Sequence, residues 1–263
     1  MPLYKSLVLN SQTIVKIWKI TESKDFLSGQ LVLKPESLER VNGMKSELHQ
    51  CGFLSVRMLL AEFGYVDEDL IYDTFGKPHL KDGKYISITH SFTFSAVVVS
   101  LSEVGVDIEK QREKIIKIAP KFIDYETAYL VENDPNLIQK LTWIWCIKES
   151  LYKLYATPGM VFKKHFLVLP FGTESNSTTA WIIENNDQRI GTMSWNDDRY
   201  MFSSHLETCF FDNKRQMRQR FGADIIWNDV TPSKEIDTET AYTVHGFPTS
   251  VQPHNTVFDI KRK

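Results

Sequence analysis

Residues 141–159 carry the strongest helical pattern in the chain, and they read Leu-Thr-Trp-Ile-Trp-Cys-Ile-Lys-Glu-Ser-Leu-Tyr-Lys-Leu-Tyr-Ala-Thr-Pro-Gly. At 100° per residue, four apolar side chains share the narrow stripe that a helix packed on a core requires: Ile144, Ile147, Leu151 and Leu154. The opposite face carries Thr142, Cys146, Glu149 and Lys153. The Thr-Pro-Gly step at 157–159 then ends the pattern. This stretch therefore predicts a long helix with one buried and one polar face.

On the polar face, Glu149 and Lys153 lie one turn apart, close enough for their opposite charges to interact. Such pairs are common on solvated helix faces, and the helix alone leaves that interpretation open. Two features upstream favour a functional one. They are the acidic run Val-Gly-Val-Asp-Ile-Glu at 104–109 and the His-Ser step at 90–91.

The composition is that of an ordinary globular protein. Of 263 residues, 42% are hydrophobic and 24% are charged, which argues against a disordered chain. The net charge of −2 argues against a nucleic acid or an anionic membrane as partner. The longest apolar stretch, at 94–101, is about half of the ~18 residues that a membrane helix needs.

The cysteines indicate a reducing compartment. Cys51, Cys146 and Cys209 are far apart and form no Cys-x-x-Cys motif. The N-terminal region has no basic segment followed by an apolar run, because Lys16 and Lys19 interrupt the apolar pattern early. We therefore expect a cytoplasmic protein.

Both strands and helices are indicated along the chain. Extended segments are predicted at 13–20, 85–89, 95–102 and 106–109, and later near 165–169, 178–184, 190–194 and 200–206. Helices are predicted at 36–40 after Pro35, at 46–63, and at 125–132 behind an Asp124 N-cap. Beyond Phe211 the pattern weakens, and the tail is either disordered or held by its scattered aromatic residues. The chain is thus a mixed α+β protein.

Asp107 and Glu109 lie two apart on an extended segment and so project to the same side. Two adjacent carboxylates repel each other unless a cation or a proton lies between them. With Glu149 as a third oxygen donor, they would suit Mg²⁺, which keeps waters and binds substrate phosphates. This pair alone also permits the simpler interpretation of two solvated acids at the end of a strand.

Two basic residues precede these acids. His90 follows a predicted strand, and it could donate a hydrogen bond to an anionic ligand or serve a structural role. Lys77, between Gly76 and Pro78, is either a turn lysine or a phosphate contact on a loop.

Four segments together resemble one known family, the 4′-phosphopantetheinyl transferases of the Sfp type. The segments at 76–78, 86–91, 104–109 and 145–153 follow that family's order and spacing. They read Gly-Lys-Pro, Ile-Ser-Ile-Thr-His-Ser, Val-Gly-Val-Asp-Ile-Glu and Trp-Cys-Ile-Lys-Glu-Ser-Leu-Tyr-Lys. Each is a weak signal alone, but four in order over about 80 residues are specific. The resemblance covers residues 10–206.

The resemblance implies an α+β fold of two similar lobes related by a pseudo-twofold, each a small antiparallel sheet packed on a long helix. The lobes are expected at 1–104 and 105–210, with most metal and catalytic residues in the second. A C-terminal extension at 211–263 has no counterpart in the family. A monomer is expected, since a pseudo-duplicated chain could form its cleft alone.

The implied reaction is Mg²⁺-dependent transfer of 4′-phosphopantetheine from coenzyme A to a serine of an acyl or peptidyl carrier protein, releasing adenosine 3′,5′-bisphosphate. Coenzyme A, the co-substrate, would lie between the lobes with Mg²⁺ on its pyrophosphate. The implied metal ligands are Asp107, Glu109 and Glu149. The implied catalytic residues are Glu149, Lys153 and His90. The implied coenzyme A contacts are Gly76, Lys77, Thr89, His90, Lys148, Arg57 and Lys45.

The chain departs from the family pattern in two places. Thr89 stands where the family commonly has serine, which keeps the hydroxyl, and the bulky Phe92 follows the His-Ser step and could narrow the entrance. The basic pair that helps relatives to bind the 3′-phosphate of coenzyme A is absent at 47–50. Lys45, Arg57 or Arg40 would have to substitute for it.

Two other functions compete with the transferase. One is a non-catalytic coenzyme A or carrier-binding module of the same fold, and the other is an unrelated metal phosphohydrolase. Retention of the three acids and of Lys153 favours the enzyme. A basic segment after the acids could dock an acidic carrier, or it could simply be solvated: Lys110, Arg112, Lys114, Lys117 and Lys121.

Overall fold

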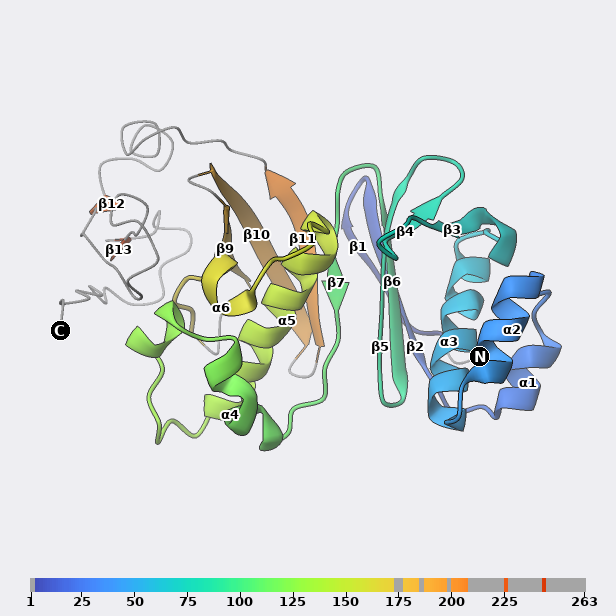
Figure 1. Cartoon of the computed structure of the whole chain (residues 1–263), viewed down its shortest axis with the longest axis horizontal. Helices are drawn as coiled ribbons and strands as arrows, with labels where there is room; N and C mark the ends of the chain where they lie inside the picture. The colour runs from blue at the N-terminus through green and yellow to red at the C-terminus, as the bar shows by residue number, and fades with distance from the viewer. Residues whose placement is uncertain are drawn as a thin grey trace. The chain divides into compact units, whose positions relative to one another are not determined.

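The computed structural model describes residues 3–172, 177–184, 187–197, 200–207, 225–226 and 243–244 (Figure 1). The chain divides into two compact units. The first contains Met1–Gln111, Glu149–Pro158 and Ser194–His205, and the second contains Arg112–Lys148, Gly159–Met193 and Leu206–Lys263. The long helix α5 (Leu137–Tyr155) contributes its last turns to the first unit and its earlier turns to the second.

The first unit is built on an antiparallel sheet with the strand order β1-β2-β6-β5. These strands are β1 (Leu3–Asn10), β2 (Thr13–Lys19), β5 (Tyr85–Ser91) and β6 (Phe94–Ser100). The extended segments predicted at 85–89 and 95–102 are confirmed, and they form a hairpin, because β5 and β6 pair directly with Ser91 opposite Phe94 at the tip. A run of β-branched residues in β2 and β6 suits such a sheet, since both of its faces are covered.

One face of this sheet carries the helices. Trp18, Val97 and Val99 join a core with helix α3 (Glu47–Glu62). Helices α1 (Lys24–Gly29) and α2 (Pro35–Gly43) complete that layer, and Figure 1 shows all three helices on the same side of the strands. The predicted helices at 36–40 and 46–63 are thereby confirmed.

The other face of the sheet buries the acidic segment. Val15, Ile17 and Val98 form a second core with Val106 and Ile108. Residues 106–107 make the short strand β7 (Val106–Asp107), which pairs with β11 (Tyr200–Glu207) by its backbone. The residues that alternate with this apolar pair, Asp107 and Glu109, lie beside β5, where Thr89 and Ser91 donate hydrogen bonds to their carboxylates.

A small hairpin completes the first unit. Strands β3 (Leu70–Tyr72) and β4 (Pro78–Leu80) pair antiparallel, after the short 3₁₀ helix η1 (Asp67–Asp69). The loop between them, at 73–77, holds the Gly-Lys step.

The second unit packs helices on a strand pair. Its helical elements are α4 (Lys114–Ile118), η2 (Ala119–Lys121), η3 (Tyr125–Ala128), the earlier turns of α5, and α6 (Phe162–His165). Strand β8 (Phe166–Val168) pairs antiparallel with β9 (Ser177–Glu184), and β10 (Asp187–Asp197) follows. Aromatic rings fill the space around α5, with Trp145 between Phe122 and Phe162 at centroid distances of 5.1 and 5.3 Å.

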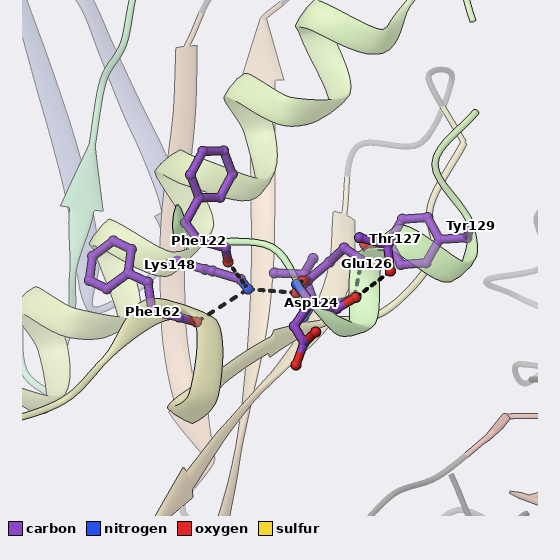
Figure 2. Close-up of polar contacts among 8 residues, drawn as sticks. Phe122, Asp124, Glu126, Thr127, Tyr129, Lys148 and Phe162 are labelled. Carbon is purple, nitrogen blue, oxygen red and sulfur yellow. Dashed lines mark hydrogen bonds and ion pairs between the residues drawn. The ribbon is translucent and has the colours of Figure 1, made fainter. Parts of the chain in front are cut away.

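A buried ion pair holds α5 in the second unit (Figure 2). The Nζ atom of Lys148 lies 2.8 Å from Oε1 of Glu126, and the two side chains are 0% and 1% exposed. Lys148 also donates hydrogen bonds to the carbonyl oxygens of Phe122 and Phe162. The N–H of Val168 donates to Glu126 at 2.9 Å. Burial lowers the pKa of Lys148, and Glu126 opposes that shift.

One predicted helix is wrong. Instead of a helix at 125–132 the structure has the 3₁₀ helix η3, and Asp124 makes no side-chain cap bond to it. The N–H of Asp124 donates to Oε2 of Glu126, whose side chain turns inward toward Lys148. A long-range partner thus overrides the local helix signal at this point.

The predicted buried stripe of α5 is confirmed, because Ile144, Ile147 and Leu151 are fully buried. The predicted polar face is shorter than expected, since Thr142 and Cys146 are buried as well. The hydroxyl of Thr142 donates to the carbonyl oxygen of its own helix at Ile138, so it needs no water. Glu149 and Lys153 keep partial exposure.

The expectations for the tail fall on residues outside the described part, apart from the paired strands β12 (Ile225–Ile226) and β13 (Thr243–Val244). Cys51 and Cys146 are buried thiols outside any disulfide, and Cys209 lies outside the described residues. Within the described ranges, no helix combines the length and the apolar character needed to cross a membrane. The lobe boundaries after 104 and 210 stay predictions.

Replacing Lys148 with Met should lower the free energy of unfolding by about 3–5 kcal/mol, because Glu126 would keep a buried charge without its partner. Urea denaturation followed by tryptophan fluorescence measures this loss. The double variant Lys148→Met with Glu126→Leu should recover most of it.

The matched control is Lys140→Met, because the Lys140–Asp134 pair is partly exposed, at 21% and 15%. The free energy of unfolding of this variant should fall by no more than ~1 kcal/mol. Equal losses in the Lys148 and Lys140 variants would contradict the role given to the buried pair.

Candidate functional site

Hydroxyl groups of β5 hold the acidic segment in place. They occupy alternate positions of the strand and so face one side, at Ser87, Thr89 and Ser91. The N–H of Val106 donates to Ser87 at 3.1 Å, Thr89 donates to Oδ1 of Asp107 at 2.9 Å, and Ser91 donates to Oε2 of Glu109 at 3.0 Å. The two carboxylates therefore lie in register with the strand that ends at His90 and Ser91.

Lys153 of α5 completes the binding of Asp107. Its Nζ atom lies 2.7 Å from Oδ1 of Asp107 and 3.1 Å from the carbonyl oxygen of Val106. The other oxygen, Oδ2 of Asp107, is buried and has no hydrogen-bond partner among the described residues. An unpartnered buried carboxylate oxygen is costly, so this atom marks a place where a cation or a donor would be stabilised.

Gly105 explains how α5 comes this close to the acidic segment. A Cβ atom at this position would lie 2.0 Å from the carbonyl oxygen of Ser150 and 3.1 Å from Cβ of Leu154. Any side chain at 105 would therefore push the segment away from α5 and lengthen the bond between Lys153 and Asp107. In the sequence, a lone glycine before two acids is the only local sign of this close approach.

Glu149 lies one helical turn before Lys153 and is partly buried. Burial raises the pKa of Glu149 to about 7; the negative charges of Asp107 and Glu109 add to the rise, and Lys153 opposes it. Near neutral pH the three carboxylates are thus in electrostatic conflict. A carboxylate with a pKa near 7 is well suited to accept a proton at that pH.

The chemistry of this donor set fits a divalent cation. Mg²⁺ binds carboxylate oxygens, and it would relieve both the unpartnered Oδ2 of Asp107 and the raised pKa of Glu149. In the described part of the chain, however, no three His, Cys, Asp or Glu side chains are already arranged around one point. Lys153 holds Asp107 instead. The expected convergence of Asp107, Glu109 and Glu149 on one ion therefore stays a prediction.

His90 lies at the end of β5, with its ring against Gly52 of α3, where a Cβ atom would lie 3.4 Å from the ring. Burial lowers the pKa of His90, and the positive charges of His49, Lys153 and Arg40 lower it further. The imidazole is therefore neutral near pH 7 and lies in positive surroundings. Such surroundings favour an anionic ligand.

Gly76 and Lys77 belong to the tight loop between β3 and β4. Gly76 has a φ of 85°, which glycine adopts without strain, and the carboxylate of Asp73 accepts the N–H groups of Phe75 and Lys77. The Nζ atom of Lys77 donates to the carbonyl oxygen of Leu154, at the C-terminal end of α5, at 2.9 Å. An ammonium has three donors, so this contact leaves Lys77 able to bind a phosphate as well.

Two of the expected coenzyme A contacts have internal partners instead. Lys148 is enclosed in its pair with Glu126 in the second unit. Arg57 is 4% exposed, lies 3.0 Å from Asp67, and its guanidinium lies 3.5 Å from the ring centroid of Phe53. Because neither cation is accessible to a ligand, we correct both assignments to structural roles. Lys45 is exposed, and its role stays a prediction.

Comparisons with known proteins match the part of the chain that holds the acidic segment and α5. Residues 103–207 match the model of a family described as the 4′-phosphopantetheinyl transferase superfamily. The chain is 27% identical over 147 residues to the 4′-phosphopantetheinyl transferase gsp of Aneurinibacillus migulanus. That alignment covers 54% of this chain and 60% of the relative's length. The resemblance inferred from the sequence motifs is thereby confirmed, and the matched range contains Asp107, Glu109, Glu149 and Lys153.

Replacing Glu149 with Gln should stabilise the metal-free protein at alkaline pH. The folded pKa of Glu149, about 7, lies above its ordinary 4.5, so the stability that its protonated form contributes is present below pH 4.5 and is lost as the pH rises through 7. At pH 8 the variant should exceed the wild type by on the order of 2 kcal/mol, a value reduced for partial exposure.

Thermal unfolding with a chelator present measures this difference, and the exposed Glu68→Gln serves as control. Added MgCl₂ should then raise the Tm of the wild type but not that of Glu149→Gln. A wild type that Mg²⁺ does not stabilise would contradict the metal site.

Proposed function

We propose that this chain, matched over residues 103–207 by the 4′-phosphopantetheinyl transferase superfamily, transfers 4′-phosphopantetheine from coenzyme A to a carrier protein. The acceptor is a serine hydroxyl of an acyl or peptidyl carrier, and adenosine 3′,5′-bisphosphate is released. One observation supports this most directly. Lys153 of α5 pairs with Asp107, whose negative charge also acts on Glu149. The second carboxylate oxygen of Asp107 is buried without a hydrogen-bond partner among the described residues.

The proposed reaction asks little covalent chemistry of the enzyme. The serine oxygen attacks the phosphorus next to the pantetheine arm, a new P–O bond forms, and the bond to the bridging oxygen of the pyrophosphate breaks. Adenosine 3′,5′-bisphosphate leaves with that oxygen. Such a displacement depends on in-line positioning and on stabilising charge at oxygen, and the nucleophile belongs to the partner.

Each site residue has a role in this scheme. Glu149 accepts the serine proton, directly or through water, since its pKa lies near 7 in the free protein. Lys153 and His90 contact the pyrophosphate oxygens on which charge develops. When bound, Mg²⁺ held by Asp107, Glu109 and Glu149 would supply further positive charge to the pyrophosphate.

Arg40 fits the 3′-phosphate of coenzyme A best among the candidate basic residues. It is exposed, and its guanidinium lies 5.6 and 5.7 Å from the ring centroids of Phe53 and Tyr72. Two aromatic neighbours orient a planar guanidinium for bidentate contact with a phosphate. Its charge is also felt by His90, so both residues lie in one positive region of the first unit. Lys45 remains the second candidate.

Finer parts of the proposal come from the family resemblance. They are the pseudo-twofold between two similar lobes, coenzyme A bound between the lobes, a monomeric state, and a cytoplasmic location. The same holds for carrier docking by the basic segment that begins at Lys110. Within it, Lys114 and Lys117 are exposed on α4 while Ile115 is buried, which suits a surface for an acidic partner.

Arg40→Ala should raise the KM for coenzyme A about tenfold, the effect of losing one charge-assisted hydrogen bond. The KM for dephospho-coenzyme A should stay near the wild-type value, because that compound lacks the 3′-phosphate. Steady-state kinetics with both compounds make the comparison, and Lys45→Ala tests the second candidate in parallel. If both variants keep the wild-type preference for coenzyme A, neither residue binds the 3′-phosphate.

Incubation of a panel of apo acyl and peptidyl carriers with coenzyme A, Mg²⁺ and the protein tests the proposed function. Intact-mass spectrometry should record a gain of one phosphopantetheine arm on a carrier serine. Lys153→Met should lower the rate by at least about 100-fold, as loss of an electrostatic contact at a reacting centre does.

The other outcomes separate the competing functions. Coenzyme A that binds without labelling any carrier would identify a binding module. Coenzyme A that is consumed without labelling would identify a hydrolase.

A further inference from the structure

The tip of the β5–β6 hairpin carries a strained aromatic residue. Ser91 lies opposite Phe94, so Phe92 and Thr93 form a two-residue loop. Phe92 has a φ of 52°, whereas Thr93 has no positive φ. In two-residue hairpin turns, a first loop position with positive φ is normally occupied by glycine, asparagine or aspartate. Phenylalanine at this position carries backbone strain that glycine would avoid.

Burial in a core does not account for this strain. The side chain of Phe92 is 40% exposed. The Nζ atom of Lys110 lies 5.0 Å from the ring centroid, a distance at which cation–aromatic attraction orients the ring. Lys110 itself is exposed and follows Glu109 directly. A strained backbone beneath an exposed, oriented ring indicates a functional constraint.

The hairpin tip is fastened to the acidic site. Ser91, next to Phe92, donates to Oε2 of Glu109 at 3.0 Å. Thr89, on the same strand as Ser91, donates to Asp107. Asp107 and Glu109 lie close enough to Glu149 for their charges to act on it. An acceptor hydroxyl that approaches Glu149 therefore also comes close to these two carboxylates. A macromolecule that presents such a hydroxyl therefore comes within reach of the ring.

We propose that Phe92 is a specificity-determining residue that contacts the carrier protein beside its acceptor serine, and that Lys110 orients its ring. The inference rests on the proposed function. An apolar ring next to an ammonium fits a carrier segment with an apolar side chain beside the serine and a carboxylate within reach of Lys110. Exposed aromatic residues of this kind often act as anchors of interfaces.

Phe92→Ala should raise the KM for the carrier about tenfold, the usual loss when an interface anchor is truncated. The kcat and the KM for coenzyme A should stay within about twofold of wild type, because the ring contacts the carrier equally in the ground and transition states. Phe92→Leu should restore part of the carrier affinity. Phe26→Ala, at an exposed position of α1, is the control and should change none of these constants.

A second pair of variants separates the ring from the backbone. Phe92→Gly removes both the ring and the strain, whereas Phe92→Ala removes the ring alone. The Tm of Phe92→Gly should exceed that of Phe92→Ala by about 2–4 °C, while their carrier KM values should agree. Lys110→Glu should also raise the carrier KM and make it less sensitive to salt, with Lys81→Glu as its exposed control.

The outcomes are distinguishable. Transfer by the wild type with an unchanged carrier KM in Phe92→Ala would overturn this inference and leave the proposed function standing. Equal changes in kcat and in both KM values would assign the ring a general structural role and overturn it too. Absence of transfer by the wild type to any carrier would overturn the proposed function and, with it, the inference.

Discussion

The ion pair between Lys153 and Asp107 is the interaction on which the site depends. It joins the last turns of α5 to β7 at 2.7 Å, and both partners belong to the first unit. The bond is possible because Gly105 lets the backbone of the acidic segment pack against α5 at Ser150. Thr89 holds the same carboxylate oxygen from the side of β5. Helix, acidic segment and sheet are thereby tied together at one carboxylate.

Consecutive residues of α5 face opposite electrostatic situations. Lys148 is buried with Glu126 and two carbonyl oxygens, so its charge is compensated within the fold. Glu149 is partly buried and lies near charges of its own sign, and both effects raise its pKa, to about 7. Compensated buried charges specify a structure, whereas uncompensated ones cluster where a ligand or a proton is bound. Lys148 therefore stabilises the fold, whereas Glu149 is available to bind a ligand or a proton.

Local periodicity predicted the elements whose tertiary role agrees with their sequence pattern. Helices α3 and α5 and the β5–β6 hairpin are of this kind, because their apolar residues recur at the period of the element they form. The prediction failed at 125–132, where Glu126 is drawn to a lysine that follows it by 22 residues. It also failed at Thr142 and Cys146, since the second unit covers α5 on more than one side.

The order of residues along the chain was enough to identify the available chemical groups, and the four motifs pointed to Asp107, Glu149 and Lys153. Which cations stay accessible to a ligand depends instead on how the chain folds. The fold encloses Lys148 and Arg57 in buried pairs, and it keeps Lys153 and Arg40 accessible. The physical reason is that burial and charge pairing depend on segments far apart in the chain, whereas helix and strand periods record only neighbours along it.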